Sequence, residues 1–123
     1  MNIGILAAVA LGGALGSLLR YFVASAIPSN GFPLGIFFVN ISGGLLMGVI
    51  VELGALKLSL APEVRAFLTV GILGGYTTFS TFSLDSVMLI QRGAWLAAAG
   101  YVVGSTLLSI LALFAGLYMV RAL

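Results

Sequence analysis

The side chains best suited to chemistry in this chain are neutral, and the first of them is an amide. Asn40 lies within the hydrophobic stretch Phe37–Ile41, where its side chain can donate hydrogen bonds to an anion or bond to a neighbouring helix. A polar group in apolar surroundings is costly unless it is paired, so it marks either a functional pathway or a contact between helices. The residue type alone leaves both roles open.

The most unusual stretch of the chain is Gly71–Ser83, in which Gly74 and Gly75 precede five serine or threonine residues within residues 77–83. Glycine costs a helix about 1 kcal/mol relative to alanine, and hydroxyl side chains compete for backbone hydrogen bonds. We therefore predict a helix that is discontinuous near residues 74–80. Carbonyl groups freed by such a break can hold a cation, and freed amides or hydroxyls can hold an anion. A kinked helix of purely structural use is the alternative.

Hydroxyl and aromatic side chains provide two further patterns. Tyr101, Ser105 and Ser109 are spaced four residues apart, so a helix would align them on one face over roughly 12 Å. Hydroxyls can donate to an anion without holding it too firmly for conduction. Phe79 and Phe82 could present their positive ring edges to an anion. The alternatives are serines that bond back to their own helix and phenylalanines that face lipid or the core.

Arg20 and Asp85 are the charged residues that are expected to lean into the membrane. Arg20 stands near one end of the first run, where its guanidinium can reach the interface or give a water-filled vestibule a positive potential that attracts anions. Asp85 could pair with Arg20 or with Arg92, and the sequence leaves its role open.

The composition excludes several classes of protein. The chain has 123 residues, of which 62% are hydrophobic and 7% charged, whereas soluble domains carry ~25% charged residues. Lipid is therefore the expected solvent. The chain has no cysteine and no histidine, which removes disulfides, thiolate sites and the usual metal ligand. We expect no enzyme, since no base, nucleophile or metal cluster stands out, and no nucleic-acid partner, since the net charge is only +2.

Four hydrophobic runs predict an all-α membrane protein with a single transmembrane domain over residues 1–123. The predicted helices cover about residues 3–27, 33–54, 64–90 with the break near 74–80, and 94–121. Ala24–Ala26 resembles a signal-peptide cleavage site, but residues 1–19 carry no basic residue, so we expect the first run to remain in the protein. Small residues recur at helical spacing and predict close helix packing: Gly12/Gly16, Gly44/Gly48, Gly71/Gly75 and Gly100/Gly104.

The basic residues show almost no bias between the two ends of the predicted spans. With four spans, Lys57, Arg65 and Arg121 share one side and Arg20 and Arg92 the other. Because an excess of Lys and Arg on the cytoplasmic side sets orientation, this chain is expected to insert both ways up. Identical subunits could then form an antiparallel homodimer, with the symmetry that many transporters build from inverted repeats. The alternative is a single orientation fixed by Lys57 or by the amino terminus.

Taken together, the segments Gly12–Tyr21, Gly35–Asn40 and Gly74–Ser83 resemble the Fluc (CrcB) family of fluoride channels. The resemblance extends over all four spans in order and length. It implies a dual-topology homodimer with two antiparallel fluoride pores and a structural sodium ion at the dimer interface. It also implies passive fluoride export through the plasma or inner membrane of a bacterium or archaeon, with fluoride, membrane lipid and a second copy of the chain as partners.

The same resemblance implies roles for particular residues. Arg20 would lie in the vestibule, and the carbonyls of Gly74 and Thr77 would bind sodium. The fluoride pathway would comprise Asn40, Phe79, Phe82, Tyr101, Ser105 and Ser109. Ile36 stands where family members usually have threonine, which leaves a contribution to the pore at that position open.

Two other membrane functions are alternatives to this one. A dual-topology small multidrug transporter has similar length and four helices, but it needs a carboxylate in the first helix, and the first run contains Arg20 with no Asp or Glu. A non-transporting subunit of a membrane assembly is the second alternative, and it predicts that the purified protein carries no ion flux.

Overall fold

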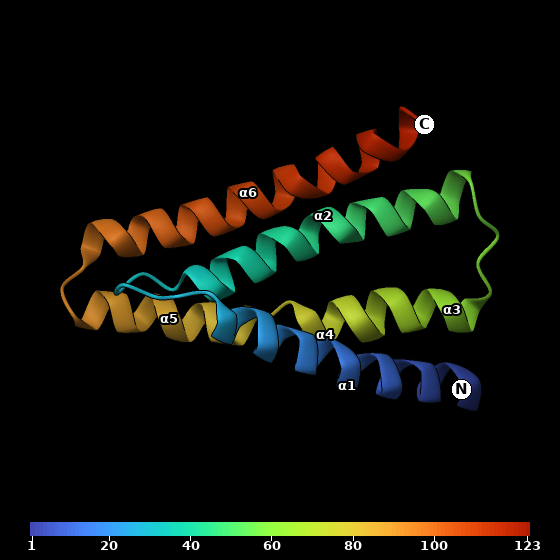
Figure 1. Ribbon diagram of the computed structural model, residues 1–123, viewed down its shortest axis with the longest axis horizontal. Coiled ribbons are helices and arrows are strands. Elements are labelled where there is room, and N and C mark those ends of the chain that lie inside the picture. The colour runs from blue at the N-terminus through green and yellow to red at the C-terminus, as the bar shows by residue number, and fades with distance from the viewer.

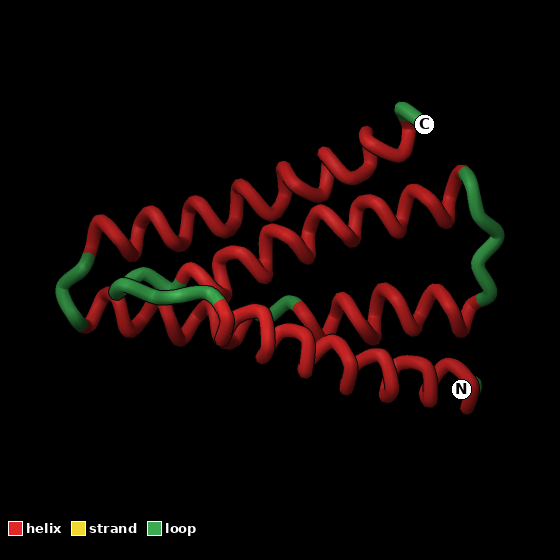
Figure 2. Tube along the Cα trace, viewed as in Figure 1, coloured by secondary structure: helices red, strands yellow, loops and turns green.

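The computed structural model describes all of residues 1–123 and consists of helices joined by short loops (Figures 1 and 2). The helical elements, in chain order, are α1 (Ile3–Ala26), α2 (Leu34–Leu56), α3 (Pro62–Ala66), η1 (Phe67–Leu73), α4 (Gly74–Tyr76), α5 (Phe79–Gln91) and α6 (Trp95–Arg121). The elements α3 to α5 together form one span, so four segments are long and apolar enough to cross a membrane. The prediction of an all-helical chain with four spans is confirmed.

The ends of the spans have recognisable local causes. The Asn2 side chain accepts a hydrogen bond from the Gly4 N–H at 2.7 Å, which caps the start of α1. Gly31, between α1 and α2, and Gly93, between α5 and α6, have φ angles of +89° and +76°. Side chains other than glycine rarely adopt this left-handed conformation, so these glycines permit the tight reversals there. Both termini lie at the same end as the α2–α3 connection (Figure 1).

Close backbone contacts hold the helices together in two pairs. α2 packs along α6, and α1 packs along η1 and α4. A Cβ atom at Gly44 would lie 2.6 Å from the Ser109 carbonyl oxygen, and one at Gly48 would overlap the Leu113 carbonyl. Small residues thus let the backbones approach, as expected for helices in lipid. Gly100 is different, because a Cβ there would meet nothing within 4 Å.

The third span is interrupted in its middle, and it changes packing partners there. Its first half, up to Tyr76, lies against α1, whereas its second half, α5, lies against α6 (Figure 1). Thr77 and Thr78 have extended backbone angles and separate the two halves. Figure 2 shows this interruption as a short loop within the span. The third span is therefore bent at Thr77 and Thr78, which lie inside the predicted segment 74–80.

The two glycines that suggested the break are themselves helical. Gly74 and Gly75 belong to α4, and the turn before them is a π-helical stretch, η1. A Cβ atom at Gly75 would lie 2.6 Å from the Gly13 carbonyl oxygen, so Gly75 serves the packing of the third span on α1. A π-helical turn often marks a functional site. The interruption therefore results from the threonine pair, not from the glycine pair.

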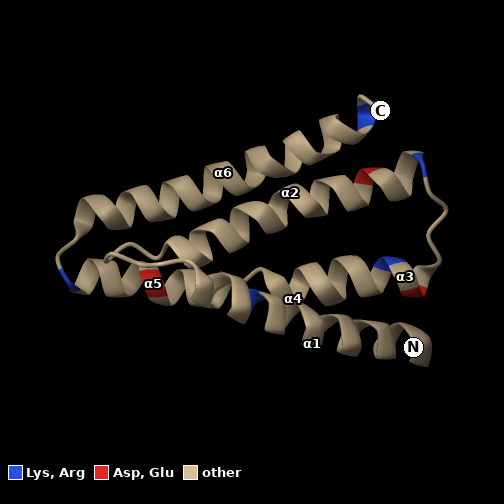
Figure 3. Cartoon of the chain, viewed as in Figure 1, with Lys and Arg blue, Asp and Glu red and all other residues tan.

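Charged residues are concentrated near the ends of the bundle, with few along the spans (Figure 3). At the end with the termini, Arg121 on α6 and Glu52 on α2 form an ion pair with an N–O distance of 3.0 Å. Glu52 is buried, and Arg121 also lies over the Tyr118 ring. This pair joins the ends of α2 and α6. Large exposed hydrophobic residues cover the outside of the bundle, as expected for a surface in contact with lipid.

Candidate functional site

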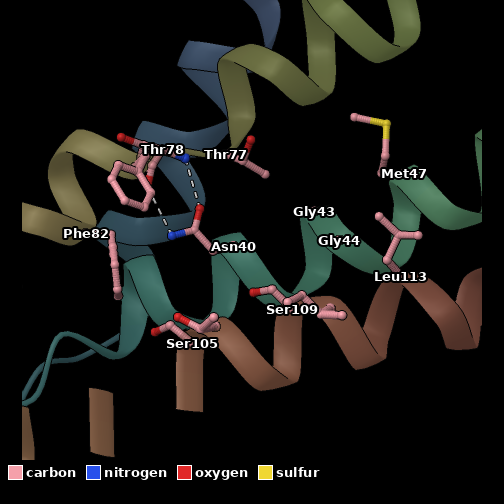
Figure 4. A pocket seen from close by; sticks show the side chains of 13 residues that line it. Asn40, Gly43, Gly44, Met47, Thr77, Thr78, Phe82, Ser105, Ser109 and Leu113 are labelled. Carbon is pink, nitrogen blue, oxygen red and sulfur yellow. Dashed lines mark hydrogen bonds between the residues drawn. The ribbon is translucent and has the colours of Figure 1, made fainter. Parts of the chain in front are cut away.

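A cavity of about 440 Å³ lies between α2, the interruption of the third span and α6. Five of the six residues expected on the anion pathway line this cavity: Asn40, Phe79, Phe82, Ser105 and Ser109. Figure 4 shows Asn40 on α2 and the two serines on α6 at the same hollow. The sixth, Tyr101, does not line the cavity, and neither does Ile36. The walls carry no charged side chain, so the site is neutral apart from its hydrogen-bonding groups.

The Asn40 amide is bonded to the backbone at the interruption. Its Oδ1 accepts from the Thr78 N–H at 2.9 Å, and its Nδ2 donates to the Thr78 carbonyl at 3.1 Å (Figure 4). An amide has two N–H donors, so one remains available to a ligand in the cavity. The contact with a neighbouring helix, one of the two roles left open for Asn40, is thus present, and it uses one of the two donors.

This pairing has a direct effect on the carbonyls before the break. In an uninterrupted helix, the Thr78 N–H would donate to the carbonyl of Gly74, four residues earlier. Here it donates to Asn40 instead, so the Gly74 carbonyl loses its helical partner. The Thr78 hydroxyl then accepts from the Thr81 N–H at 3.2 Å and caps the start of α5. Asn40 and Thr78 together make the interruption a defined structure.

Two hydroxyls on α6 are the least satisfied polar groups of the chain. The Oγ atoms of Ser105 and Ser109 are buried and have no hydrogen-bond partner within the chain. Both residues line the cavity (Figure 4). A buried hydroxyl without a partner costs about 1–3 kcal/mol, so these two require a partner from outside the chain, such as water, an anion or another protein.

Aromatic rings form one end of the cavity. Phe79 is 79% exposed in the single chain, and its ring centroid lies 5.6 Å from that of Phe82. Phe82 in turn contacts the ring of Tyr101, with centroids 5.3 Å apart. Phe82 thus has a fixed position against the core, whereas Phe79 lies on the open side of the cavity.

Tyr101 lies behind the cavity wall. It is fully buried, and its hydroxyl donates to Asp85 Oδ2 at 3.0 Å. Tyr101 lies on the same face of α6 as Ser105 and Ser109, but its hydroxyl points to Asp85 on α5. Asp85 forms no ion pair, since Arg92 donates to the Gly31 carbonyl. Neither of the two pairings that the sequence left open for Asp85, with Arg20 or with Arg92, is present within the chain, and Tyr101 is its partner.

Arg20 brings a positive charge to the interruption from α1. Its Nη1 donates to the Thr77 carbonyl at 3.4 Å, a long hydrogen bond in a partly buried position. The sequence had suggested a vestibule for this residue, and the structure places it beside the break. A guanidinium here makes the potential near the cavity more favourable to anions.

The carbonyls of Gly74 and Thr77 fit a hard monovalent cation by their chemistry. Gly74 is exposed and its carbonyl is free of its helical donor, while the Thr77 carbonyl has a second lone pair beside its contact with Arg20. No group of three acidic, histidine or cysteine residues that could hold a metal ion is present. Two carbonyls per chain cannot complete a coordination shell, so a sodium ion would need ligands from a second copy.

Several residues of this site were not predicted from the sequence. Thr78 supplies the peptide that Asn40 binds, and Gly43 and Met47 line the cavity beside it. The only sequence signal for Thr78 was its place as a hydroxyl residue before a helix start, which is typical of an N-cap. Gly43 lies three residues after Asn40, one helical turn further along the same face.

Comparisons with known proteins cover nearly the whole chain. Residues 7–117 match the family model described as CrcB-like protein, Camphor Resistance (CrcB). The chain is 50% identical over 119 residues to a protein of Nitrobacter winogradskyi named "Fluoride-specific ion channel FluC", with 94% of each chain covered. It is 51% identical over 119 residues to "Fluoride-specific ion channel FluC 1" of Nitrobacter hamburgensis, and 47% identical over 118 residues to the similarly named protein of Rhizobium meliloti.

Proposed function

This chain belongs to the CrcB family and is a multi-pass membrane protein, not an enzyme; on that premise we propose that it conducts fluoride passively out of the cell. The names of its relatives support fluoride as the ion. The observation that carries the proposal is the pair of buried, unpartnered hydroxyls of Ser105 and Ser109, which line the same cavity as Asn40, a cavity without charged walls.

These donors are suited to an ion that must lose water and still leave. Fluoride is small and a strong hydrogen-bond acceptor, so neutral N–H and O–H groups can replace part of its hydration shell. A fixed positive charge in the wall would hold it too firmly for conduction. Arg20 lies beside the interruption and can attract anions toward the cavity without belonging to its wall. The inside-negative membrane potential then drives fluoride outward.

The single chain is only part of the pore, and the proposed assembly is an antiparallel homodimer with two pores. The cavity is open beside Phe79, which a second subunit would cover. Gly74 is exposed, and a Cβ atom there would meet only the Thr69 carbonyl of its own span at 3.6 Å. Packing within the chain therefore does not require glycine at this position, whereas close approach of a second copy would.

A structural sodium ion at the centre of this dimer completes the proposal. The carbonyls of Gly74 and Thr77 from both copies would hold it, and its charge would stabilise the two interrupted spans against each other. The ion is not transported. Prolonged dialysis of the purified protein against a large organic cation is expected to inactivate it, and full activity after this exchange would exclude the sodium ion.

The test of conduction is fluoride efflux from proteoliposomes that contain the purified protein. A potassium gradient with valinomycin sets the voltage, a fluoride electrode records efflux, and chloride is the comparison ion. We expect rapid, voltage-driven fluoride efflux with little chloride efflux. An absence of fluoride flux from well-reconstituted protein would reject the channel and favour the non-transporting assembly subunit.

The antiparallel arrangement has its own test. The chain contains no cysteine, so a single cysteine introduced at the exposed loop position Ser29 (Ser29→Cys) reports orientation without background. An impermeant thiol reagent added outside the liposomes is expected to label about half of the copies if both orientations insert equally. Labelling of all copies or of none under the same conditions would contradict dual topology.

A further inference from the structure

The last turn before the interruption is bound to α2 by a partly buried hydrogen bond between side chains that do not line the cavity. The hydroxyls of Ser42 and Tyr76 lie 2.9 Å apart, and Tyr76 is buried. Ser42 Oγ also lies 3.2 Å from the Val39 carbonyl, to which it can only donate. Because a serine hydroxyl has one proton, Tyr76 donates to Ser42 and Ser42 donates to Val39. The phenol therefore has a single acceptor with a fixed direction.

The neighbouring residues fit α2 just as closely. A Cβ atom at Gly43 would overlap the methyl group of Thr77 and would lie 3.4 Å from the Tyr76 ring. Asn40 holds the peptide of Thr78, as described above. Three consecutive residues of the third span, Tyr76 to Thr78, are thus each held by α2. The π-helical stretch before them shows that the span leaves regular α-helical geometry well before it breaks.

We propose that Ser42 is a positioning residue for the cation site at the interruption, acting through the Tyr76 hydroxyl. This inference rests on the proposed sodium ion. The carbonyl of Gly74 begins the turn that contains Tyr76, and that of Thr77 follows it directly, so both move when Tyr76 moves. With the bond to Ser42 in place, the two carbonyls keep one orientation before a cation binds, and binding does not have to order them.

Variants of Ser42 and Tyr76 should have unequal effects, which makes the hydrogen bond between them testable. Tyr76→Phe removes the donor but keeps the ring against Gly43. Ser42→Ala leaves the buried phenol of Tyr76 without its acceptor, which is more costly than removing both partners. The double variant Ser42→Ala with Tyr76→Phe removes that orphaned group again. The exposed Ser25 makes no hydrogen bond, so Ser25→Ala is the matched control.

The measurement is the sodium concentration that gives half of the thermal stabilisation of the purified full-length protein, titrated in detergent at constant ionic strength with an organic cation as replacement. We expect Ser42→Ala to raise this concentration about tenfold, because it orphans the Tyr76 hydroxyl, and Tyr76→Phe about threefold, because it only removes a hydrogen bond. The double variant is expected to match Tyr76→Phe, and Ser25→Ala to match the unmodified protein.

Each outcome decides the inference. A half-stabilising sodium concentration unchanged within twofold in Ser42→Ala, or a double variant worse than Ser42→Ala, would overturn it. Sodium-independent stability of the unmodified protein would overturn it as well. If Ser42→Ala does not fold, Tyr76→Phe and the double variant still give the comparison. Fluoride flux is measured on the same preparations: no flux with the expected sodium shifts would reject the proposed channel and leave the positioning role intact.

Discussion

Replacing Asn40 by aspartate changes one group of the cavity and adds one charge. Asn40 Oδ1 would still accept from the Thr78 N–H, since a carboxylate oxygen accepts as well as an amide oxygen. The second oxygen would replace Nδ2, which lies 3.1 Å from the Thr78 carbonyl oxygen. An attractive contact thereby becomes a repulsive one, and the remaining N–H donor of the cavity is lost.

The charge gives the larger effect. Two unit negative charges about 4 Å apart repel each other by about 4 kcal/mol at an effective dielectric constant of 20, and by about 1 kcal/mol in bulk water. With about 1.4 kcal/mol for each factor of ten, fluoride occupancy beside Asn40→Asp falls between about fivefold and a thousandfold. The cavity is partly enclosed by protein, so we expect the loss to lie toward the larger figure.

The assay is voltage-driven fluoride efflux from proteoliposomes, with Asn30→Asp as the control. Asn30 lies in the exposed loop between α1 and α2, so the same change of charge occurs there in water and is screened by salt. Thermal unfolding of each variant separates lost conduction from lost folding. If Asn40→Asp folds and retains more than half of the flux of the unmodified protein, the assignment of the cavity as the anion pathway is wrong.

Three further predictions concern packing, the aromatic wall and the ion pair. Gly48→Ala would push a methyl group into the facing carbonyl of α6 and is expected to destabilise the chain by about 1–3 kcal/mol in thermal unfolding, whereas Gly100→Ala, on an open face, is expected to be neutral or slightly stabilising. Phe79→Ile is expected to abolish most fluoride flux, and it should not lower stability because the ring is exposed in the single chain. The control Phe38→Ile, at an exposed position of α2, is expected to retain flux. Equal flux in the two variants would contradict the aromatic role. Arg121→Gln leaves the Glu52 carboxylate buried and unpaired, and is expected to cost about 1–3 kcal/mol of stability. This is less than for a fully buried ion pair, because the guanidinium is half exposed. An unchanged unfolding temperature would contradict the prediction.

The four spans and the interruption could be predicted because they depend on local properties of the sequence. Hydrophobic runs of sufficient length specify membrane helices, and a cluster of hydroxyl residues in such a run is unusual enough to mark a break. The exact place of the break was not predictable from Gly74 and Gly75, because their function depends on α1. Gly75 permits the approach to Gly13, a contact between residues 62 positions apart.

Side-chain partners between helices were the part that the sequence could not supply. Helical spacing correctly places Tyr101 on one face with Ser105 and Ser109, but it does not say which element lies opposite each of them. Tyr101 faces Asp85 on α5 and uses its hydroxyl there, whereas the two serines face the cavity. The ion pair of Glu52 and Arg121 is likewise invisible to periodicity, because its partners are brought together only by the packing of α2 on α6.

The hydrogen bonds that Asn40 makes to Thr78 explain why an ion in the cavity needs the serines of α6. Its amide oxygen and one of its two N–H groups hold the peptide of Thr78, so only one N–H can reach an ion in the cavity. One donor cannot replace the hydration shell of a small anion, and the unpartnered hydroxyls of Ser105 and Ser109 are further unused donors in the same cavity. Because Asn40 binds the peptide at the break, it has fewer donors left for the ion, and the serines of α6 provide the others. A site assembled from such weak, separate donors favours passage over retention.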